Sequence, residues 1–472
     1  MEKVIGMTLS EMEEANILLR SENEQIKQEN AELLRTIEQL KEEIALLKGG
    51  KKSRSSSTPP SQDIGRSNKN SLRSKSKRKS GGQSGHKGVT LLLSDRPDEI
   101  INHQPEECEH CGKDLEEVES TSFNRRQVVD IPPISPVYIE HRSHVKTCPN
   151  CEFENRGVFP DRIQGPIQYG ASIEAMVGYL SIYQSLPYNR IKRLLNDFFK
   201  LSLSEGTIDT YLENLAEKST PDYEEIRERI QQSEVVGADE TGCRVNGKMH
   251  WFHVWQSPVL TFIVAFFSRG YKVIEKYFPG GFIESFYVSD CWAPQLKVMV
   301  KARQLCMAHL LRELINFIEN LKSQWSGQTK ELFLRAIELK KKMTESDYLD
   351  PPAEVAALNT QLDELLKVDY SKFHRKEQAF IKRLNKHRQS IFTFLVYHKV
   401  PPDNNASERA IRNVKVKTKV SGQFRNKEGK GAERYAKIRS VIDTTIKNGQ
   451  NVYAAMVALA NRKIISPTVV SK

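Results

Sequence analysis

Three acidic residues in the second half of the chain could together bind divalent metal ions. Asp239 follows the short apolar run 235–238 and Asp290 follows the run 286–289, so each is predicted to end a β-strand. Glu408 lies near the start of a predicted helix, within the sequence DNNASERAIR. Carboxylates brought together repel one another unless a cation compensates them, and Mg²⁺ prefers oxygen ligands of this kind. Two Mg²⁺ (or Mn²⁺) ions held in this way can activate a nucleophile and stabilise the leaving oxygen of a phosphodiester.

Taken singly, each of these acids is more readily explained as a surface or helix-capping residue. Two strand-terminal aspartates followed by a helical glutamate form an ordered set, however, and this set favours metal-dependent phosphodiester chemistry. Glu240 is adjacent to Asp239, and alternation along a strand is expected to direct it to the opposite side of the sheet. His309, in the sequence CMAH, could contact DNA or the scissile phosphate, or could be structural. Cys291 is interpreted as a packing residue, because this chemistry needs no protein nucleophile.

Cysteines form a second candidate metal site. Four of the seven lie in two CxxC pairs: Cys108 with Cys111, and Cys148 with Cys151. Four thiolates at this spacing suit one tetrahedral Zn²⁺ ion and leave no open coordination position, so the zinc is expected to be structural. The alternative is four free cysteines in a core. The long stretch between the pairs has room for a β-hairpin, with strands predicted at 126–131 and 137–145.

The N-terminal residues carry a heptad pattern that predicts a coiled coil over 1–48. One series occupies the d positions: Met12, Leu19, Ile26, Leu33, Leu40 and Leu47. The other occupies the a positions: Leu9, Asn16, Asn23, Asn30, Ile37 and Ile44. Leucine at d favours two strands, and asparagine at a restricts the register at a cost in stability. The pattern therefore indicates a parallel homodimer (or a higher oligomer), the alternative being one amphipathic helix packed on its own chain.

Residues 49–90 are predicted to form a disordered basic linker. They are rich in Ser, Gly, Lys and Arg and contain too few apolar residues to offset the entropy of ordering. Residues 51–88 hold eleven Lys and Arg against Asp63 alone, so this segment is either a solvated linker or a contact to DNA phosphates. A zinc-binding module is expected next, over 91–165.

Residues 166–230 predict a helix-turn-helix-like region. Helices are expected at 173–182, 188–199 and 206–216. Ser204 is a plausible N-cap for the last of these. Thr207, Asp209 and Thr210 would then face DNA, although a plain helical hairpin explains the spacing equally well.

The remaining residues predict an α/β catalytic domain at 231–425 and a C-terminal helical segment at 426–472. Strands are expected at 251–255, 260–267 and 286–289, and a helix at 271–278. A run rich in Leu, Lys and Glu predicts a mainly helical insertion over about 307–400. The chain is thus expected to be a multidomain α/β protein with coiled-coil, zinc-binding and helical DNA-binding regions before the catalytic core.

The charge distribution favours nucleic acid as the partner. Lys and Arg number 71 against 60 Asp and Glu, and residues 409–439 hold eleven of them against Glu428 and Glu433. No apolar run approaches the ~20 residues of a membrane helix, and no signal peptide is visible, so an intracellular protein is expected.

The motifs resemble those of the IS66 family of insertion-sequence transposases, from residue 81 to the C-terminus. The matching stretches are GGQSGHKG at 81–88, the paired CxxC at 108–151, VVGADETG at 235–242, YVSDCW at 287–292, QLCMAHLLREL at 304–314 and DNNASERAIR at 403–412. The resemblance implies an RNase-H-like core with a DDE triad at Asp239, Asp290 and Glu408, interrupted by the helical insertion. It also implies double-stranded DNA as the partner, both as transposon ends and as target.

The function that follows is cleavage at transposon ends and transfer of the freed 3′-hydroxyl to target DNA. The resemblance supplies strand transfer, whereas the residues alone argue only for phosphodiester chemistry. A prokaryotic, cytoplasmic and nucleoid-associated protein is implied, with accessory proteins of the same element as further partners. Two alternatives are a non-catalytic DNA-binding regulator derived from a transposase and an RNase-H-like nuclease without strand transfer.

Overall fold

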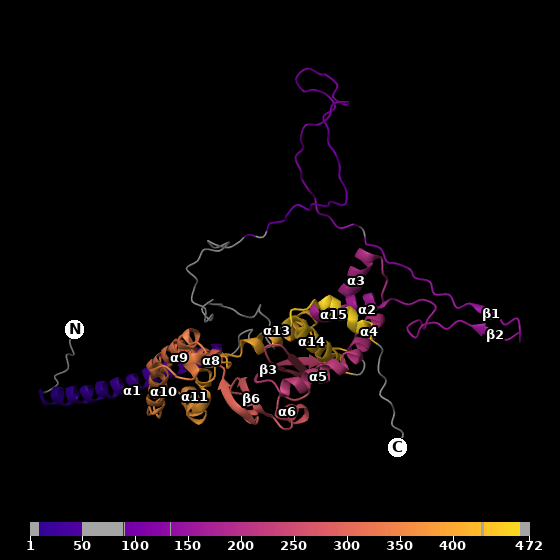
Figure 1. Ribbon diagram of the computed structural model, residues 1–472. Coiled ribbons are helices and arrows are strands. Elements are labelled where there is room, and N and C mark those ends of the chain that lie inside the picture. The colour runs from indigo at the N-terminus through magenta and orange to yellow at the C-terminus, as the bar shows by residue number, and fades with distance from the viewer. Residues whose placement is uncertain (1–8, 50–87, 89, 133, 426–428, 463–472) are drawn as a thin grey trace, which may run out of the picture.

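The computed structural model describes residues 9–49, 88, 90–132, 134–425 and 429–462 (Figure 1). Most of the predicted basic linker at 49–90 lies outside these residues. The N-terminal segment is one continuous helix, α1 (Leu9–Gly49), as the heptads predict. The apolar side chains described between Ile17 and Leu40 are exposed, among them Leu19 at 56%, Leu33 at 59% and Leu40 at 52%. Among the described residues, no helix is long and apolar enough to cross a membrane.

A five-stranded mixed sheet forms the centre of the body. Its strands are β3 (Val235–Val245), β4 (Lys248–Gln256), β5 (Thr261–Phe266), β6 (Phe282–Ser289) and β7 (Val300–Leu305). Their order across the sheet is β5-β4-β3-β6-β7. The first three strands pair antiparallel, whereas β6 runs parallel to β3 and β7 runs parallel to β6.

The position of Asp239 differs from the prediction. It lies in the middle of the 11-residue strand β3 and not at the end of a short one. Residues 240–245 continue the strand because every residue of β4 pairs with β3, from Gly237 up to a tight turn at Asn246 and Gly247. Both turn residues have positive φ, at 46° and 80°, which suits a two-residue hairpin. Cross-strand pairing thus extends the strand through a polar stretch that carries no apolar signal.

The two faces of the sheet pack against different helices. Helices α5 (Thr220–Gln231) and α6 (Lys272–Tyr277) lie over one face, where Val236 and Ala238 of β3 are buried. Helices α13 (Asn405–Ser421) and α14 (Gly431–Lys447) lie over the other face, with Cys243 of β3 in their core. Successive residues of a strand point to opposite faces, so the parity of a β3 residue decides which helices it meets.

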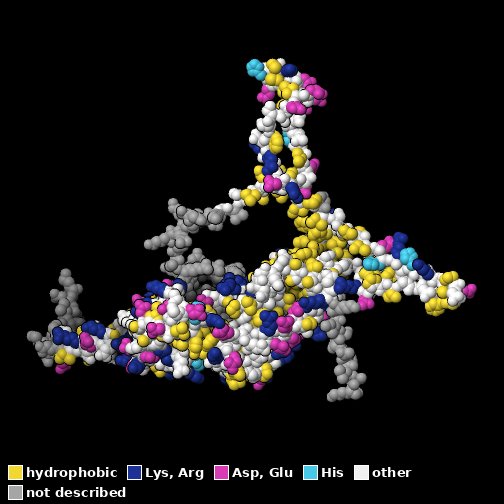
Figure 2. All heavy atoms as spheres, in the orientation of Figure 1, with side chains coloured by type: hydrophobic (Ala, Val, Ile, Leu, Met, Phe, Trp, Pro, Cys, Tyr) yellow, Lys and Arg dark blue, Asp and Glu magenta, His cyan; other side chains and the backbone are white. Residues whose placement is uncertain are grey.

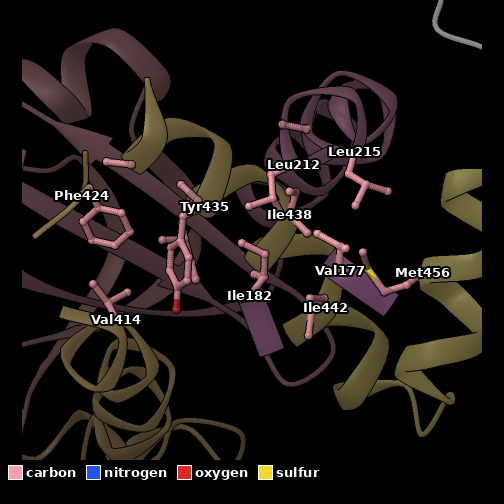
Figure 3. Close-up of a cluster of buried hydrophobic side chains, with 14 of the residues drawn as sticks. Val177, Ile182, Leu212, Leu215, Val414, Phe424, Tyr435, Ile438, Ile442 and Met456 are labelled. Atoms are coloured by element: carbon pink, nitrogen blue, oxygen red, sulfur yellow. The ribbon is translucent and has the colours of Figure 1, made fainter. Parts of the chain in front are cut away.

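The helices before the sheet share a hydrophobic core with the helices at the C-terminus. The elements before the sheet are α2 (Ala171–Gly178), the π-helix η3 (Tyr179–Tyr183), α3 (Tyr188–Phe199) and α4 (Glu205–Lys218), and the last helix is α15 (Val452–Ala460). In Figure 3, Val177 and Ile182 lie among side chains of α14 and Met456 of α15. The predicted helices at 173–182, 188–199 and 206–216 are confirmed, and Ser204 caps α4 by accepting a hydrogen bond from the Thr207 N–H at 3.0 Å.

Two buried cations satisfy carbonyls in and just after the π-helix η3. Lys417 of α13 donates to the Ser181 carbonyl at 3.0 Å and the Leu186 carbonyl at 3.1 Å. Arg439 of α14 donates to the Ile182 carbonyl at 3.3 Å. Burial lowers the pKa of Lys417 to about 8. A π-helical turn leaves carbonyls without their usual α-helical partners, and here side chains from distant helices supply the donors.

The segment after β6 confirms the predicted helical insertion. The short helix α7 (Ala293–Leu296) precedes β7, and then come α8 (Met307–Leu321), α9 (Gln324–Lys342), α10 (Ala353–Leu366), α11 (Arg375–Lys386) and α12 (Thr393–Val396). Two 3₁₀ turns, Ser346–Tyr348 and Arg388–Ser390, lie between them. These helices bury a separate core that continues into Phe286 and Val288 of β6, so the insertion is joined to the β6 side of the sheet.

The hairpin predicted between the cysteine pairs is wrong. Residues 126–131 and 137–145 form no ladder, and a small hairpin of β1 (Val145–Thr147) and β2 (Glu154–Arg156) instead surrounds the second pair. The physical reason is the absence of a covering layer. Val128 is 92% exposed and Tyr138 is 85% exposed. An isolated two-stranded hairpin with neither face covered is marginal in water.

Candidate active site

Asp239 and Asp290 lie level with one another on adjacent parallel strands. The ladder between β3 and β6 pairs Val235 with Phe286 and Gly237 with Val288. Continuing this register by two residues places Asp239 beside Asp290, which directly follows β6. Both positions have the same parity as Gly237 and Val288, so both carboxylates belong to the face covered by α13. Cross-strand parity therefore brings the two predicted aspartates to one place, although only Asp290 ends a strand.

A buried asparagine fixes the start of α13 against this face. Asn404 donates to the Ala238 carbonyl at 2.6 Å, and its Oδ1 accepts a hydrogen bond from the Ser407 hydroxyl at 2.6 Å. A Cβ at Gly237 would lie 2.6 Å from Ser407 Oγ and 2.7 Å from Asn404 Oδ1, so only glycine allows this close approach. Asp403 Oδ1 accepts a hydrogen bond from the Asn405 N–H at 2.9 Å. Glu408 then follows in the first turn of the helix.

Glu408 is held by an arginine that the sequence did not single out. Arg312 of α8 donates from Nη1 to Glu408 Oε1 at 2.9 Å and from Nη2 to Oε2 at 3.1 Å. His309, one turn earlier on α8, has its Nε2 at 3.8 Å from Glu408 Oε1. Its buried Nδ1 has no hydrogen-bond partner among the described residues. The structure thus places His309 beside the third acid of the site.

Asp239 and Glu408 have shifted pKa values, in opposite directions. Burial, followed by the negative charges of Glu240 and Asp290, raises the pKa of Asp239 to about 7. Burial also acts to raise the pKa of Glu408, but the hydrogen bonds and charge of Arg312 outweigh it, so this pKa is lowered. A buried aspartate beside other acids, with its pKa raised in this way, is typical of a site that awaits a cation.

Glu240 faces away from the other three acids, as alternation along the strand predicts. Its Oε1 accepts hydrogen bonds from Arg269 Nε at 3.1 Å and Nη2 at 2.8 Å. The Arg269 guanidinium lies 4.8 Å from the ring centroid of Trp251 and 3.8 Å from that of Trp292. The negative charge of Glu240 is therefore compensated on the α5–α6 side of the sheet, and this acid is not needed as a metal ligand.

The donor set fits Mg²⁺ or Mn²⁺ in part. Asp239 and Asp290 supply carboxylate oxygens from one face, which is the donor type that these ions prefer. Among the residues that the structure describes, however, no three His, Cys, Asp or Glu side chains form a group able to hold a metal. Glu408 directs both of its oxygens to Arg312 instead. Of the predicted triad, Asp239 and Asp290 thus lie together on one face, whereas Glu408 is hydrogen-bonded to Arg312.

Comparison with protein families decides the relationship. A model described as the transposase IS66 family matches residues 166–432, more than half of the chain. This protein belongs to the IS66 family of transposases. A second model, the zinc-finger binding domain of IS66 transposases, matches residues 105–152. A search of curated proteins found no match. A transposase of this family is a DNA-binding protein, so the expected class of function and of partner is confirmed at this level.

The zinc-finger domain of this IS66 transposase contains all four cysteines of the CxxC pairs. Each pair forms a turn: the Gly112 N–H donates to the Cys108 carbonyl, and the Glu152 N–H donates to the Cys148 carbonyl, both at 2.9 Å. Hydrogen bonds from neighbouring backbone N–H groups lower the pKa of Cys108 and of Cys148, which favours thiolates. The two pairs are not brought together, because the extended segments that carry them stand apart in Figure 2. Each turn suits half of a four-thiolate site.

The residues predicted to face DNA in the helical region have mixed environments. Thr210 of α4 is exposed, whereas Thr207 is half-buried near the start of the helix. Asp209 is half-buried and accepts hydrogen bonds from the Tyr188 hydroxyl at 3.0 Å and from Arg434 Nη1 at 3.2 Å. The Asp209 carboxylate thus joins α4 to α3 and α14, and a contact from it to DNA would require breaking these bonds.

The stability of the protein in Mg²⁺-free buffer is expected to fall as the pH rises from about 4 to about 7. Asp239 keeps its proton to about pH 7 in the folded chain, whereas its ordinary value is 3.8. Between these values the folded state binds more protons than the unfolded state, so raising the pH favours unfolding. Urea unfolding midpoints of the wild type and of Asp239→Asn, measured across this range, test the prediction. An equal fall in both proteins would show that Asp239 is not the cause.

Proposed function

We propose that this IS66 transposase cuts DNA at the ends of an insertion sequence and joins the freed 3′ ends to target DNA. Asp239, Asp290 and Glu408 are its catalytic acids. The observation that carries the proposal is the common face of the sheet: the two aspartates lie level on β3 and β6, and the first turn of α13 lies over them. The raised pKa of Asp239, which comes first from burial and then from the charges of Glu240 and Asp290, also supports a site for a cation on this face.

The sheet supports an RNase-H-like core. Three antiparallel strands lead into two parallel strands, with helices on both faces, in the order β5-β4-β3-β6-β7. This order places the first strand, β3, beside the fourth, β6, so that acids from both meet near the centre of the sheet. The helical insertion begins directly after β7 and returns at α13, which carries Glu408. A long insertion can therefore separate Asp290 from Glu408 in sequence without separating them in space.

The chain's own residues would hold the metal ions and orient the phosphodiester. Asp239, Asp290 and Glu408 would hold two Mg²⁺ ions, which when bound lower the pKa of water and stabilise charge on the oxygens of a phosphate. Asn404 positions the α13 helix that carries Glu408, through its hydrogen bond to the Ala238 carbonyl. His309 lies close enough to the site to donate a hydrogen bond to a phosphate oxygen or to orient the 3′-hydroxyl.

Exposed cations on α13 support a path for DNA next to the acids. Arg409, Arg412 and Lys419 are exposed, and their spacing of three and seven residues places them along one side of the helix. Arg409 also lines a cavity of about 300 Å³ beside Gly237 and Asn404. Phosphate contacts of this kind fix the position of a duplex without reading its sequence. We place the backbone of the bound DNA end along this side of α13.

Incubation with DNA carrying the element's own ends tests the proposed function. In Mg²⁺ the protein is expected to nick the end duplex at a defined position and to join it to a second duplex. A duplex of the same composition with scrambled ends is the control. Binding without nicking would favour the non-catalytic regulator, and nicking without joining would favour a simple nuclease.

We also propose that α1 forms a parallel two-stranded coiled coil. Its four described d residues are more than half exposed in the single chain, as expected for a seam that awaits a partner: Leu19, Ile26, Leu33 and Leu40. Replacing Leu33 with Pro costs about 3 kcal/mol or more and should break the seam. Sedimentation of residues 1–48 is expected to give a dimer for the wild type and a monomer for the variant. A monomeric wild-type fragment at micromolar concentration would exclude the coiled coil.

A further inference from the structure

Glu408 and Arg312 form a closed contact where a metal site is expected. Both carboxylate oxygens accept from the two terminal nitrogens of one guanidinium, at 2.9 and 3.1 Å. This two-pronged geometry is the strongest common pairing between arginine and a carboxylate. A divalent cation on the same carboxylate would lie within a few ångströms of the guanidinium, and the two positive charges would repel each other. The contact therefore opposes the completion of the metal site.

The same arginine is well placed to meet DNA. Arg312 retains 31% of its side-chain exposure and Glu408 retains 22%, so the pair lies at the mouth of the site and not deep in a core. Arg312 also lies within electrostatic reach of Asp239, so it stands near the proposed metal site. A phosphate offers the guanidinium the same pair of oxygens that Glu408 offers. When a phosphate replaces the Glu408 carboxylate, the Arg312 guanidinium is still paired with an anion.

We propose that Arg312 is a DNA-sensing switch. In the free protein it holds Glu408 away from the metal, and in the complex it moves to a backbone phosphate of the bound strand and releases Glu408 to complete the metal site. The inference rests on the proposed function, because it takes Glu408 to be a metal ligand. It explains why the described residues contain two acids on the active face and a third that is already engaged. The switch would prevent the free enzyme from holding a fully assembled two-metal centre.

Metal affinity measured with and without DNA tests the switch. Mn²⁺ binding is followed by electron paramagnetic resonance, with duplex DNA from the element's ends as the added ligand. For the wild type, DNA is expected to tighten Mn²⁺ binding about tenfold, and Mn²⁺ to tighten DNA binding by the same factor, because coupling is reciprocal. For Arg312→Gln, Mn²⁺ affinity without DNA should already be raised, and the addition of DNA should change it little.

A matched control separates the loss of the contact between Arg312 and Glu408 from the loss of a positive charge. Arg383 of α11 is paired with Glu313 at 2.7 and 2.8 Å and lies within electrostatic reach of Asp290. Arg383→Gln thus removes a positive charge near the site without touching Glu408, and it should keep the coupling to DNA. Should Arg312→Gln not fold, Arg312→Lys keeps the charge but loses the two parallel hydrogen bonds. It is expected to raise Mn²⁺ affinity by a smaller factor.

Two results separate the failure of the switch from the failure of the proposed function. If Arg312→Gln and Arg312→Lys bind Mn²⁺ no better than the wild type does without DNA, Arg312 does not oppose the metal and the switch is wrong. If Glu408→Gln binds Mn²⁺ as tightly as the wild type does in the presence of DNA, Glu408 is not a ligand. In that case the triad itself is wrong, and the switch fails with it.

Discussion

Replacing Glu408 with Gln is expected to lower the rate of nicking of end DNA by about a thousandfold. The substitution keeps the size and hydrogen-bonding ability of the side chain but removes the charge that would hold the second metal ion. Metal ions supply several kcal/mol of transition-state stabilisation, and each ~1.4 kcal/mol corresponds to a factor of ten in rate. Single-turnover nicking in Mg²⁺ measures the effect, and binding to the end duplex should survive.

Two control variants keep this result specific. Glu433→Gln removes an exposed acid from the first turn of α14, a helix position comparable to that of Glu408 in α13. Glu240→Gln removes a buried acid next to Asp239, but on the opposite face of the sheet and in contact with Arg269. Both proteins should nick at rates within about tenfold of the wild type. A Glu408→Gln protein that nicks as fast as these controls would remove Glu408 from the site.

The wild-type protein is expected to bind one zinc ion per chain. Replacing Cys111 with Ser should abolish this binding and unfold the zinc-finger region. Structural zinc sites contribute apparent free energies of about 10–16 kcal/mol to the folding of small domains. The described part of this region, residues 105–152, buries no apolar side chain. It therefore has no hydrophobic core that could keep it folded without zinc. Elemental analysis of protein purified without chelators measures the zinc, and limited proteolysis measures the order of the region.

The part of the protein that contains the three hydrophobic cores, from Ala175 to Ala460, should remain folded in the Cys111→Ser protein. These cores contain no residue of the zinc-finger region. Cys291→Ser is the matched control, since Cys291 packs against the helical insertion and is remote from both CxxC pairs in sequence. It should keep the full zinc content. Wild-type protein without zinc, or a Cys111→Ser protein that retains it, would refute the four-thiolate site.

The sequence predicted those parts of the fold and site that depend on local patterns. Apolar runs located β5 and β6, helical periodicity located α2 to α4, and the DNNASER motif placed Glu408 in the first turn of a helix. The position of Asp290 after a strand is also local, because the strand ends where the apolar run ends. The resemblance to the transposase family was recognised from short motifs, which contain the paired cysteines and the three acids.

Parts that depend on contacts distant in sequence were not predicted. Strand β3 extends beyond Asp239 because β4 pairs with it, although its residues 240–245 are mostly polar or small. Arg312 lies 96 residues before Glu408, and nothing in its own surroundings marks it as a partner. Asn404 could have been suspected, since it immediately precedes the helix of Glu408, but its bond to the Ala238 carbonyl is a tertiary contact. The hairpin at 126–145 was predicted from two strand-like runs in the long stretch between the cysteine pairs, which is insufficient without a layer to cover it.

The shared core restricts how the helices that were predicted to contact DNA can change in this family. Helices α2 to α4 bury their apolar faces against α14 and α15, and Lys417 and Arg439 bind carbonyls in and just after η3 from within the catalytic body. These helices therefore cannot be exchanged between relatives as an independent cassette, because a graft that changed the backbone at η3 would leave the buried Lys417 ammonium without its acceptors. Substitutions that change what these helices contact are expected on the exposed faces of α3 and α4, with the buried faces left intact.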